Sequence, residues 1–507
     1  MILLDSPQDL TPALYRRIVA AKEPVGVAAV ARARVEKARA QFLVHLEGGA
    51  LCYGVNTGLG ALVSLDLDED DRRALSRHIL LGRAGGLGPP FPAAVVRGAI
   101  LIKLVQFLTG HSAVSAGLCD YLAARLNDDL IPYVPSEGLG MAGEIIPLSH
   151  LVQPFIGEGF FLGEDGRPHP AATILSARGL APYSPQSKEG IALINGVAFG
   201  PTAAFERAER LGETLTLATL AAATTVEGLG ASLEAFDEAV ARLRPDPGIA
   251  DINSALRQIF TGSQVPRSER QPPVSIRVTP QVLGALHHAL TRLYRGIVAE
   301  WRAVSDNPAF LPDGTGATSG RLLHSGNFHS AELTQRVESA SLALAQVAIL
   351  SERRLHRLLD QRYSGLSPQL AKAPGRDAGL VILHKAALGV TAKVRALAVP
   401  PSLLHGESSF GTEDAMTLIF PALDRLGELD RLTRLACAYE LYAALAAVDQ
   451  RGAPPGAAIA RLHETVRETI PPYDGDRPYG HEVAALARLF EEKRLPLPGV
   501  MGPWEET

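Results

Sequence analysis

Cysteine is scarce in this chain of 507 residues, and its scarcity excludes a disulfide framework. Cys52, Cys119 and Cys437 lie far apart, and no C-x-x-C pair occurs. A zinc site built from thiolates is therefore not predicted either. So few cysteines in a long chain are typical of a reducing compartment, and we predict a cytoplasmic protein.

An excess of positive charge and long apolar runs are also missing. Lys plus Arg is 49 and Asp plus Glu is 54, which gives a net charge of −5 and does not favour binding to nucleic acid. The most apolar stretches, at 217–230 and 435–448, are too short or carry a glutamate, so they predict buried helices and no membrane span. The N-terminus lacks a basic segment followed by an apolar run, so no signal peptide is expected.

Several catalytic motifs are absent from the sequence. It has no phosphate-binding G-x-x-x-x-G-K-[ST], no zinc-protease H-E-x-x-H and no esterase G-x-S-x-G. His287 and His288 are adjacent and so face different sides of a helix, which does not indicate a metal site. We expect no metal.

Helical spacing is the main positive signal from about residue 200 onward. Apolar residues recur there in steps of four and three, as at Leu333, Val337, Ala340, Leu344 and Val347. Similar runs cover 201–243, 278–304, 378–398 and 412–447. Because many of these runs carry Ala and Leu on more than one face, we expect a bundle core or a subunit interface, and hence an oligomer.

The first 200 residues differ from the rest in their content and spacing of Gly and Pro. Clusters of Gly and Pro separate shorter segments and predict loops between short helices. We therefore predict a mainly α fold with three regions: a loop-rich helical region at 1–200, a central bundle of long helices at 201–450 and a helical tail at 451–507. An amphipathic helix is expected near 481–493 in the tail.

The glycine-rich loop from Gly138 to His150 resembles the signature loop of the aromatic amino acid ammonia-lyases, the family of histidine and phenylalanine ammonia-lyase. Seven further matches follow the family's order over roughly residues 20 to 490. They are Tyr53-Gly54-Val55-Asn56-Thr57-Gly58, Lys188-Glu189-Gly190 with Asn195-Gly196, Ser275-Ile276-Arg277 before Pro280-Gln281, Asp306-Asn307-Pro308, Gly326-Asn327-Phe328-His329, Ser351-Glu352-Arg353-Arg354 and Glu413-Asp414. The resemblance implies a long central helix bundle of the ammonia-lyase and fumarase type, a homotetramer, and sites built from loops of several subunits.

One departure concerns the family's cofactor. The family's electrophile, a methylidene-imidazolone group, forms when an Ala-Ser-Gly tripeptide cyclises and its serine loses the hydroxyl as water. The corresponding residues here are Met141, Ala142 and Gly143, and alanine has no oxygen to eliminate. We therefore expect that this cofactor does not form and that Met141 fills the space of the missing ring.

Other departures fall on the family's substrate pocket. Val274 stands where the pattern places a catalytic tyrosine, and valine cannot transfer a proton. Gly82 and Arg83 match positions that shape the pocket for the substrate ring, where Arg83 would present a fixed cation to an anionic group or an acceptor. Thr412 replaces a glutamine that ordinarily precedes Glu413.

The remaining polar residues of the family's site are present. The resemblance implies that Tyr53 is a general base, that Arg277 and Asn195 bind the substrate carboxylate, that Phe328 packs beside the cofactor and that Glu413 binds an amine. Each residue also has a structural interpretation. Tyr53 would cap a helix, Asn195 would form an Asn-Gly turn, Phe328 would fill the core, and Arg277 would pair with Glu413.

Three functions stay open on the sequence. The first is an enzyme without the cofactor that acts on a small aromatic or amino-bearing carboxylic acid by proton abstraction, through elimination, addition, isomerisation or cyclisation. The second is a non-catalytic relative that binds a ligand or a partner subunit. The third is a conventional aromatic amino acid ammonia-lyase.

Overall fold

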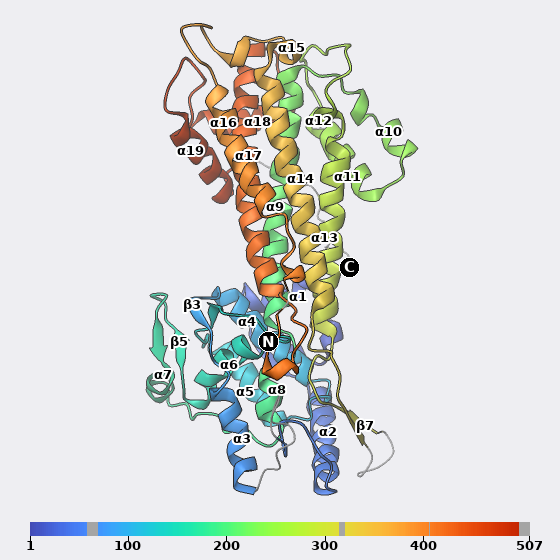
Figure 1. Cartoon of the computed structure of the whole chain (residues 1–507), viewed down its shortest axis with the longest axis vertical. Coiled ribbons are helices and arrows are strands. Elements are labelled where there is room, and N and C mark those ends of the chain that lie inside the picture. The colour runs from blue at the N-terminus through green and yellow to red at the C-terminus, as the bar shows by residue number, and fades with distance from the viewer. Residues whose placement is uncertain (58–68, 314–319, 405, 496–507) are drawn as a thin grey trace. The chain divides into compact units, whose positions relative to one another are not determined.

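Helices dominate the computed structural model, which describes residues 1–57, 69–313, 320–404 and 406–495 (Figure 1). The few strands are short and pair two by two. The mainly α fold predicted from the sequence is confirmed. None of the helices in these ranges is long and apolar enough to cross a membrane.

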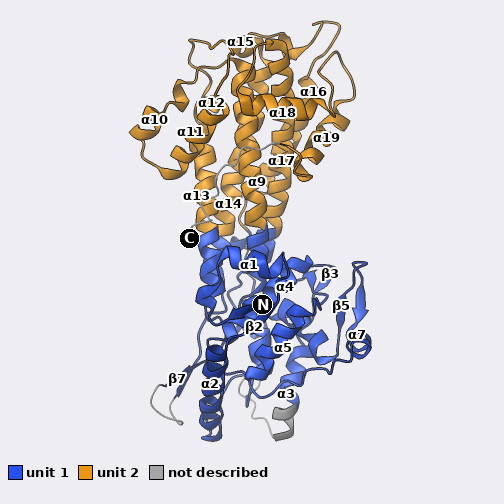
Figure 2. Ribbon diagram, turned by 180° about the vertical axis from the view of Figure 1, so that it is seen from behind, with its two compact units in different colours: residues 1–206, 294–335, 401–423 blue, residues 207–293, 336–400, 424–507 orange. Residues whose placement is uncertain are grey.

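The chain forms two compact units, each assembled from three separate stretches of sequence (Figure 2). Unit 1 contains residues 1–206, 294–335 and 401–423. Unit 2 contains residues 207–293, 336–400 and 424–507. The three regions inferred from sequence texture, 1–200, 201–450 and 451–507, stay a prediction about how the chain is organised.

Unit 1 combines short helices with the four strand pairs found in the described residues. Its helices are α1 (Pro12–Val19), α2 (Ala29–Glu47), α3 (Glu69–Leu81), α4 (Ala93–Phe107), α5 (Ala116–Asn127), α6 (Ile145–Val152), α7 (Ala171–Ala177) and α8 (Glu189–Ile194). A parallel pair joins β1 (Ile2–Leu4) to β2 (Val25–Val27). The antiparallel pairs are β3 (Leu87–Pro90) with β4 (Pro135–Glu137), β5 (Phe160–Leu162) with β6 (Pro168–Pro170), and β7 (Ala309–Pro312) with β8 (Gly320–Leu323).

Helix α4 runs through the core of unit 1, since every residue from Val95 to Phe107 is buried. Two of these residues are charged, and each donates hydrogen bonds to backbone carbonyls. Arg97 reaches the carbonyls of Ile18 and Leu126, at 3.1 and 2.7 Å. Such bonds allow a cation to remain inside an apolar core.

Unit 2 is built around long helices that run side by side (Figure 1). The four longest are α9 (Phe199–Leu229), α13 (Thr279–Arg302), α14 (Ala331–Leu359) and α17 (Ile419–Arg451), and unit 1 contains one end of each. The shorter helices are α10 (Glu238–Leu243), α11 (Pro247–Ile259), α12 (Val274–Arg277), α15 (Gln361–Ser364), α16 (Val381–Ala396), α18 (Ala457–Arg467) and α19 (Tyr479–Glu491). The helix expected near 481–493 is α19.

The helical run predicted over 201–243 ends earlier than the apolar spacing suggested. Helix α9 stops at Leu229, because Gly230 adopts a φ of +58° that a helix interior excludes. The amide of Ala231 then donates back to the carbonyl of Val226 at 3.1 Å. A glycine in this conformation closes the helix, and the chain continues into a separate short helix, α10.

Several buried charges in unit 2 pair with one another. Arg354 of α14 donates from Nε and Nη2 to the two carboxylate oxygens of Glu440 on α17, at 2.5 and 2.8 Å. Both side chains are essentially inaccessible to solvent. Thr225 of α9 donates to the same carboxylate at 2.8 Å, so this one acid connects three long helices.

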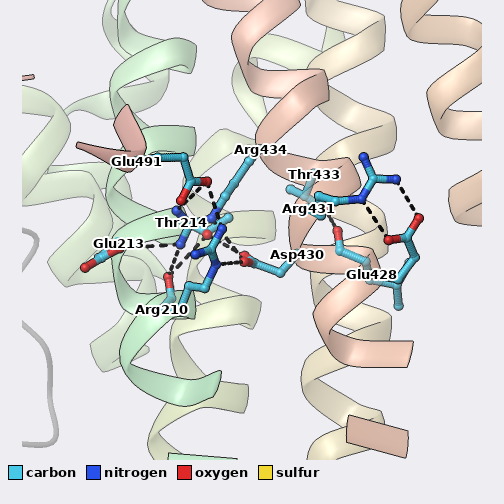
Figure 3. Close-up of polar contacts among 10 residues, drawn as sticks. Arg210, Glu213, Thr214, Glu428, Asp430, Arg431, Thr433, Arg434 and Glu491 are labelled. Atoms are coloured by element: carbon cyan, nitrogen blue, oxygen red, sulfur yellow. Dashed lines mark hydrogen bonds and ion pairs between the residues drawn. The ribbon is translucent and has the colours of Figure 1, made fainter. Parts of the chain in front are cut away.

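A second polar cluster ties the C-terminal helix α19 to the bundle (Figure 3). Asp430 accepts from Arg210 at 2.9 Å and from Arg434 at 3.0 Å, and it is almost fully buried. Thr214 donates to its other oxygen at 2.5 Å. Arg210 also reaches Glu491 of α19 at 2.8 Å, so the cluster joins α9, α17 and α19.

Candidate active site

A cavity of about 1010 Å³ lies within unit 1. Loops and the ends of short helices form its wall, and they come from distant parts of the sequence. The lining residues are found at positions 53, 83, 142–145, 191, 194, 195, 307, 324, 326, 328, 329, 409, 410 and 412–415. A cavity of this size, with polar groups from several loops, is the usual form of a small-molecule site.

The cavity brings together most of the residues that the sequence singled out. Those on its wall are Tyr53, Arg83, Ala142, Gly143, Asn195, Phe328, Thr412 and Glu413. Residues from several family motifs therefore meet inside a single chain, whereas the resemblance implied that several subunits build the site. Gly58, the last residue of the motif that begins at Tyr53, lies outside the described residues.

Four other predicted residues do not line this cavity. Gly82 and Met141 are direct neighbours of lining residues, and Met141 is buried with its sulfur accepting from the amide of Ile146 at 3.4 Å. Arg277 and Val274 lie on α12 in unit 2. There Arg277 donates from Nε to the carbonyl of Pro272 at 3.0 Å, and Val274 is 60% exposed.

Asn195 follows α8 and is fixed by hydrogen bonds at both ends of its amide. Its Oδ1 accepts from the amide of Gly196 at 2.7 Å, and its Nδ2 donates to the carbonyl of Asn307. Gly196 has a φ of +98°, and an added Cβ would lie 2.6 Å from Oγ of Ser305, so this turn requires glycine. The predicted Asn-Gly turn is therefore present, and it places the asparagine in the cavity wall.

Lys103 of α4 supports the same turn from inside the core. Its Nζ donates to the carbonyls of Ala192 and Asn195, at 2.8 Å each. Burial lowers the pKa of this ammonium to about 8, and the charge of nearby Lys188 adds to the lowering. Lys188 is itself buried and paired with Asp306 at 2.8 Å.

Glu144 is a cavity residue that sequence reasoning missed. Its carboxylate accepts from three successive amides at the start of α9, those of Ala198, Phe199 and Gly200, at 2.6, 2.5 and 2.7 Å. An acid at a helix N-terminus is favoured by the exposed amides there. Burial raises the pKa of Glu144 to about 7, while the three amides and Lys103 oppose the rise. The available signal was an acid directly after Gly143.

The loop before Glu144 can be tested for its fit to the family's cofactor. Ala142 is nearly buried and lines the cavity, and a Cβ placed on Gly143 would lie 3.5 Å from the side chain of Phe328. The position beside Phe328 agrees with the resemblance. The chemistry of the residues does not fit, because Met141, Ala142 and Gly143 carry no hydroxyl for the dehydration of serine. No reaction step is therefore routed through that group.

The acidic side of the cavity comes from the segment before α17. Glu413 accepts from Oγ of Ser408 at 3.3 Å, and Asp414 follows it on the wall. Phe410 also lines the cavity, is 97% exposed and has a φ of +54°, which is rare for a residue with a side chain. Acids at a cavity wall are suited to binding an amine.

Two histidines were also missed as site residues. His324 and His329 line the cavity, and Nε2 of His329 is buried with no hydrogen-bond partner among the described residues. Asn307 lies beside them and accepts from the amide of Ser325 at 2.8 Å. His329 and Asn307 both belong to motifs of the resemblance, which was the signal available in the sequence.

Comparison with known proteins identifies the family. A model of the family described as aromatic amino acid lyase matches residues 10–468. Histidine ammonia-lyase from Sorangium cellulosum is 34% identical over 484 residues, covering 93% of this chain and 94% of the relative. The enzyme of the same name from Deinococcus radiodurans is 32% identical, covering 94% and 92%. A crystal structure of tyrosine aminomutase from Streptomyces globisporus is 26% identical with a TM-score of 0.88, covering 97% of each chain.

These findings correct two predictions from the sequence. The relatives favour a conventional ammonia-lyase, so the prediction of a cofactor-free enzyme with a different reaction was wrong, and its alternative stands. The expectation of no cofactor is overturned with it, since this family is the one for which the resemblance implies the methylidene-imidazolone group. Both predictions gave more weight to the three loop residues at 141–143 than to the similarity of the rest of the chain to the family.

The evidence for the family comes from the whole length of the chain. The family model covers most of its residues, the curated relatives match almost end to end, and the mainly helical fold is that of solved members. The chain therefore belongs to the aromatic amino acid lyase family and is an enzyme of the lyase type.

Proposed function

We propose that this lyase releases ammonia from an α-amino acid with an aromatic side chain, and that histidine is the first substrate to test. The observation that carries this proposal is the identity of about one third to histidine ammonia-lyases over more than 90% of the chain. The cavity of unit 1 supports it, because acids, an amide and a tyrosine from matching motifs line one wall.

The roles of the residues follow from the bonds that must change. The reaction breaks the C–N bond at the α carbon and a C–H bond at the β carbon, and it leaves a carbon–carbon double bond and ammonia. Tyr53 accepts the β proton on its phenol oxygen. Asn195 orients the substrate carboxylate through its fixed amide, and Glu413 with Asp414 binds the amino group.

The direct test is release of ammonia from L-histidine, L-phenylalanine and L-tyrosine by the purified full-length protein. The arylacrylate product is measured by its ultraviolet absorbance, and incorporation of deuterium from heavy water reports proton exchange at the β carbon. We expect one of these amino acids to be turned over and Tyr53→Phe to abolish the turnover. A folded protein that releases ammonia from none of them would overturn the proposal.

We also propose that the protein is a homotetramer and that α12 of another copy supplies Arg277 as the carboxylate clamp. Three partly exposed apolar side chains of unit 2 support an interface: Leu342 of α14 is 57% exposed, and Ile382 and Leu388 of α16 are 51% and 39% exposed. Arg277 does not line the cavity of its own chain, which fits this arrangement.

Mixed oligomers test this arrangement. Tyr53→Phe and Arg277→Ala are expected to be inactive alone, and their co-expression should restore part of the activity, because some sites then combine a native Tyr53 with a native Arg277. Light scattering should give four chains per particle. Hybrids without activity would contradict the shared site. A cytoplasmic location stays a prediction from the cysteine content.

A further inference from the structure

Arg83 presents a guanidinium to the cavity and has no acidic partner among the described residues. It lies just after the C-terminal end of α3 and is half-buried. Its hydrogen bond among the described residues is a long one, 3.5 Å from Nη1 to the carbonyl of its neighbour Gly82. A guanidinium has five N–H donors in a fixed fork that matches an oxygen anion. Most of these donors are therefore available to a bound molecule.

The cavity wall carries charges of both signs. One of its acids, Glu144, is already bound to three backbone amides. Arg83 is the only arginine or lysine among the described lining residues, whereas Glu413 and Asp414 come from the segment before α17. Under the proposed function, Asn195 holds the α-carboxylate and the two acids hold the amine. The two charged groups of an amino acid then have partners, and Arg83 still has no acidic partner in the part of the chain that the structure describes.

The size of the cavity allows for a third charged group. Its volume of about 1010 Å³ lies at the upper end of the range for drug-sized ligands, about 300–1,000 Å³, so it exceeds the space that one small ring needs. A partly desolvated cation gains most from an anion that replaces its lost water. The ligand that best matches this wall carries an oxygen anion on its side chain.

We propose that Arg83 determines substrate specificity by binding an anionic oxygen group, a carboxylate or sulfonate, on the aromatic side chain of the substrate. This inference rests on the proposed function, because it takes the α-carboxylate and the amine as bound elsewhere in the cavity. It assigns the substrate class as aromatic amino acids with an acidic ring substituent.

Binding of product-like acrylates tests the proposal without any turnover. Isothermal titration calorimetry compares 4-carboxycinnamate with cinnamate, which lacks the second carboxylate. We expect the native protein to bind 4-carboxycinnamate about tenfold more tightly or better, as for a charge-assisted hydrogen bond. Arg83→Gln should remove this preference, and Arg83→Lys should keep part of it.

A matched control is available in the same unit. Arg321 is an exposed arginine on β8 that does not line the cavity, so Arg321→Gln removes the same charge at another place and should keep the preference. Thermal unfolding of each variant confirms that it is folded.

Three results would overturn the proposal. The native protein binds both acids equally well, or binds neither, or Arg83→Gln weakens both acids by the same factor. In the last case Arg83 binds the carboxylate that the two ligands share. A protein that keeps the preference but releases no ammonia from any amino acid would refute the proposed function alone, so the two failures are distinguishable.

Discussion

Buried charges have different partners in the two units. In unit 1, Glu144 accepts from three backbone amides, and Lys103 donates to two backbone carbonyls. In unit 2, Arg354 pairs with Glu440, and Arg434 pairs with Asp430. Three buried cations of unit 1 are exceptions, since each pairs with an acid: Lys188 with Asp306, Arg97 with Asp129 and Arg125 with Asp128.

The difference follows from how each unit satisfies its backbone. Long helices bond their own amides and carbonyls, so Arg354 and Asp430 in unit 2 find their partners on other side chains. Arg425 of α17 reaches a backbone carbonyl, that of Val399, which lies in a loop. Short helices and loops leave backbone groups without partners, and charged side chains in unit 1 bind these groups. Arg451 supports this explanation within unit 2, because it donates to the carbonyls of Gly228 and Leu229 where α9 ends. Buried charges therefore fix loops around the cavity and join helices in the bundle.

The largest expected effect is on activity in unit 1, at the amide that lines the cavity. Asn195→Ala removes the group that orients the substrate carboxylate under the proposed function, and it should lower ammonia release by about a hundredfold or more. Arg321→Gln, at an exposed arginine on β8 outside the cavity, is the control and should leave ammonia release unchanged. A folded Asn195→Ala protein that releases ammonia at the native rate would refute the prediction.

The next effect is on stability in unit 2. Glu440→Gln leaves the buried cation of Arg354 without its anion and should lower the free energy of unfolding by about 3–5 kcal/mol. Urea denaturation measures the change. Glu238→Gln removes an acid from an exposed pair with Arg242 on α10 and should change the stability little. A loss below about 1 kcal/mol for Glu440→Gln would contradict the role given to this pair.

The third effect concerns the pH dependence of unit 1. The folded pKa of Glu144 is raised from 4.5 to about 7, so between these values the folded state holds a proton that the unfolded state has released. Its contribution to stability is therefore present below pH 4.5 and is lost as the pH rises toward 7, by about 3 kcal/mol in total. Glu144→Gln should flatten the stability profile across this window in urea titrations. If the free energy of unfolding of the native protein and that of Glu144→Gln changed in the same way between pH 4.5 and 7, the prediction would be refuted.

The smallest effect is expected at the bundle surface. Figure 3 includes an exposed pair, Arg431 with Glu428, beside the buried cluster of Asp430. Glu428→Gln should change the free energy of unfolding by no more than about 1 kcal/mol, because solvent screens the pair. Asp430→Asn, which leaves two arginines short of an anion, should cost several times more. Equal losses in the free energy of unfolding for Glu428→Gln and Asp430→Asn would show that burial does not make the Asp430 cluster more stabilising than the exposed pair.

The sequence predicted the fold better than the site. Apolar spacing located the long helices because it reflects local backbone geometry. It missed the end of α9 at Leu229, because the positive φ of Gly230 ends that helix. The motifs located Tyr53, Asn195, Phe328 and Glu413, which line one cavity.

Other parts of the site needed tertiary contacts. Glu144 was missed because its partners are 54 to 56 residues away in the sequence. His329 was part of a motif, but its unpartnered nitrogen appears only when its surroundings are known. The prediction that no cofactor forms was wrong for another reason. It gave three residues, 141–143, more weight than the similarity of the whole chain to the family.

The sequence by itself determined the family and the mainly helical fold, because ordered motifs and helical periodicity are properties of neighbouring residues. The tertiary structure alone decided that the motifs meet in one cavity of unit 1 and that Arg277 lies outside it. It also decided that Arg83 has no acidic partner among the described residues. These features depend on contacts between residues far apart in the chain, and no local pattern specifies which distant backbone amide or carboxylate a buried charge will bind.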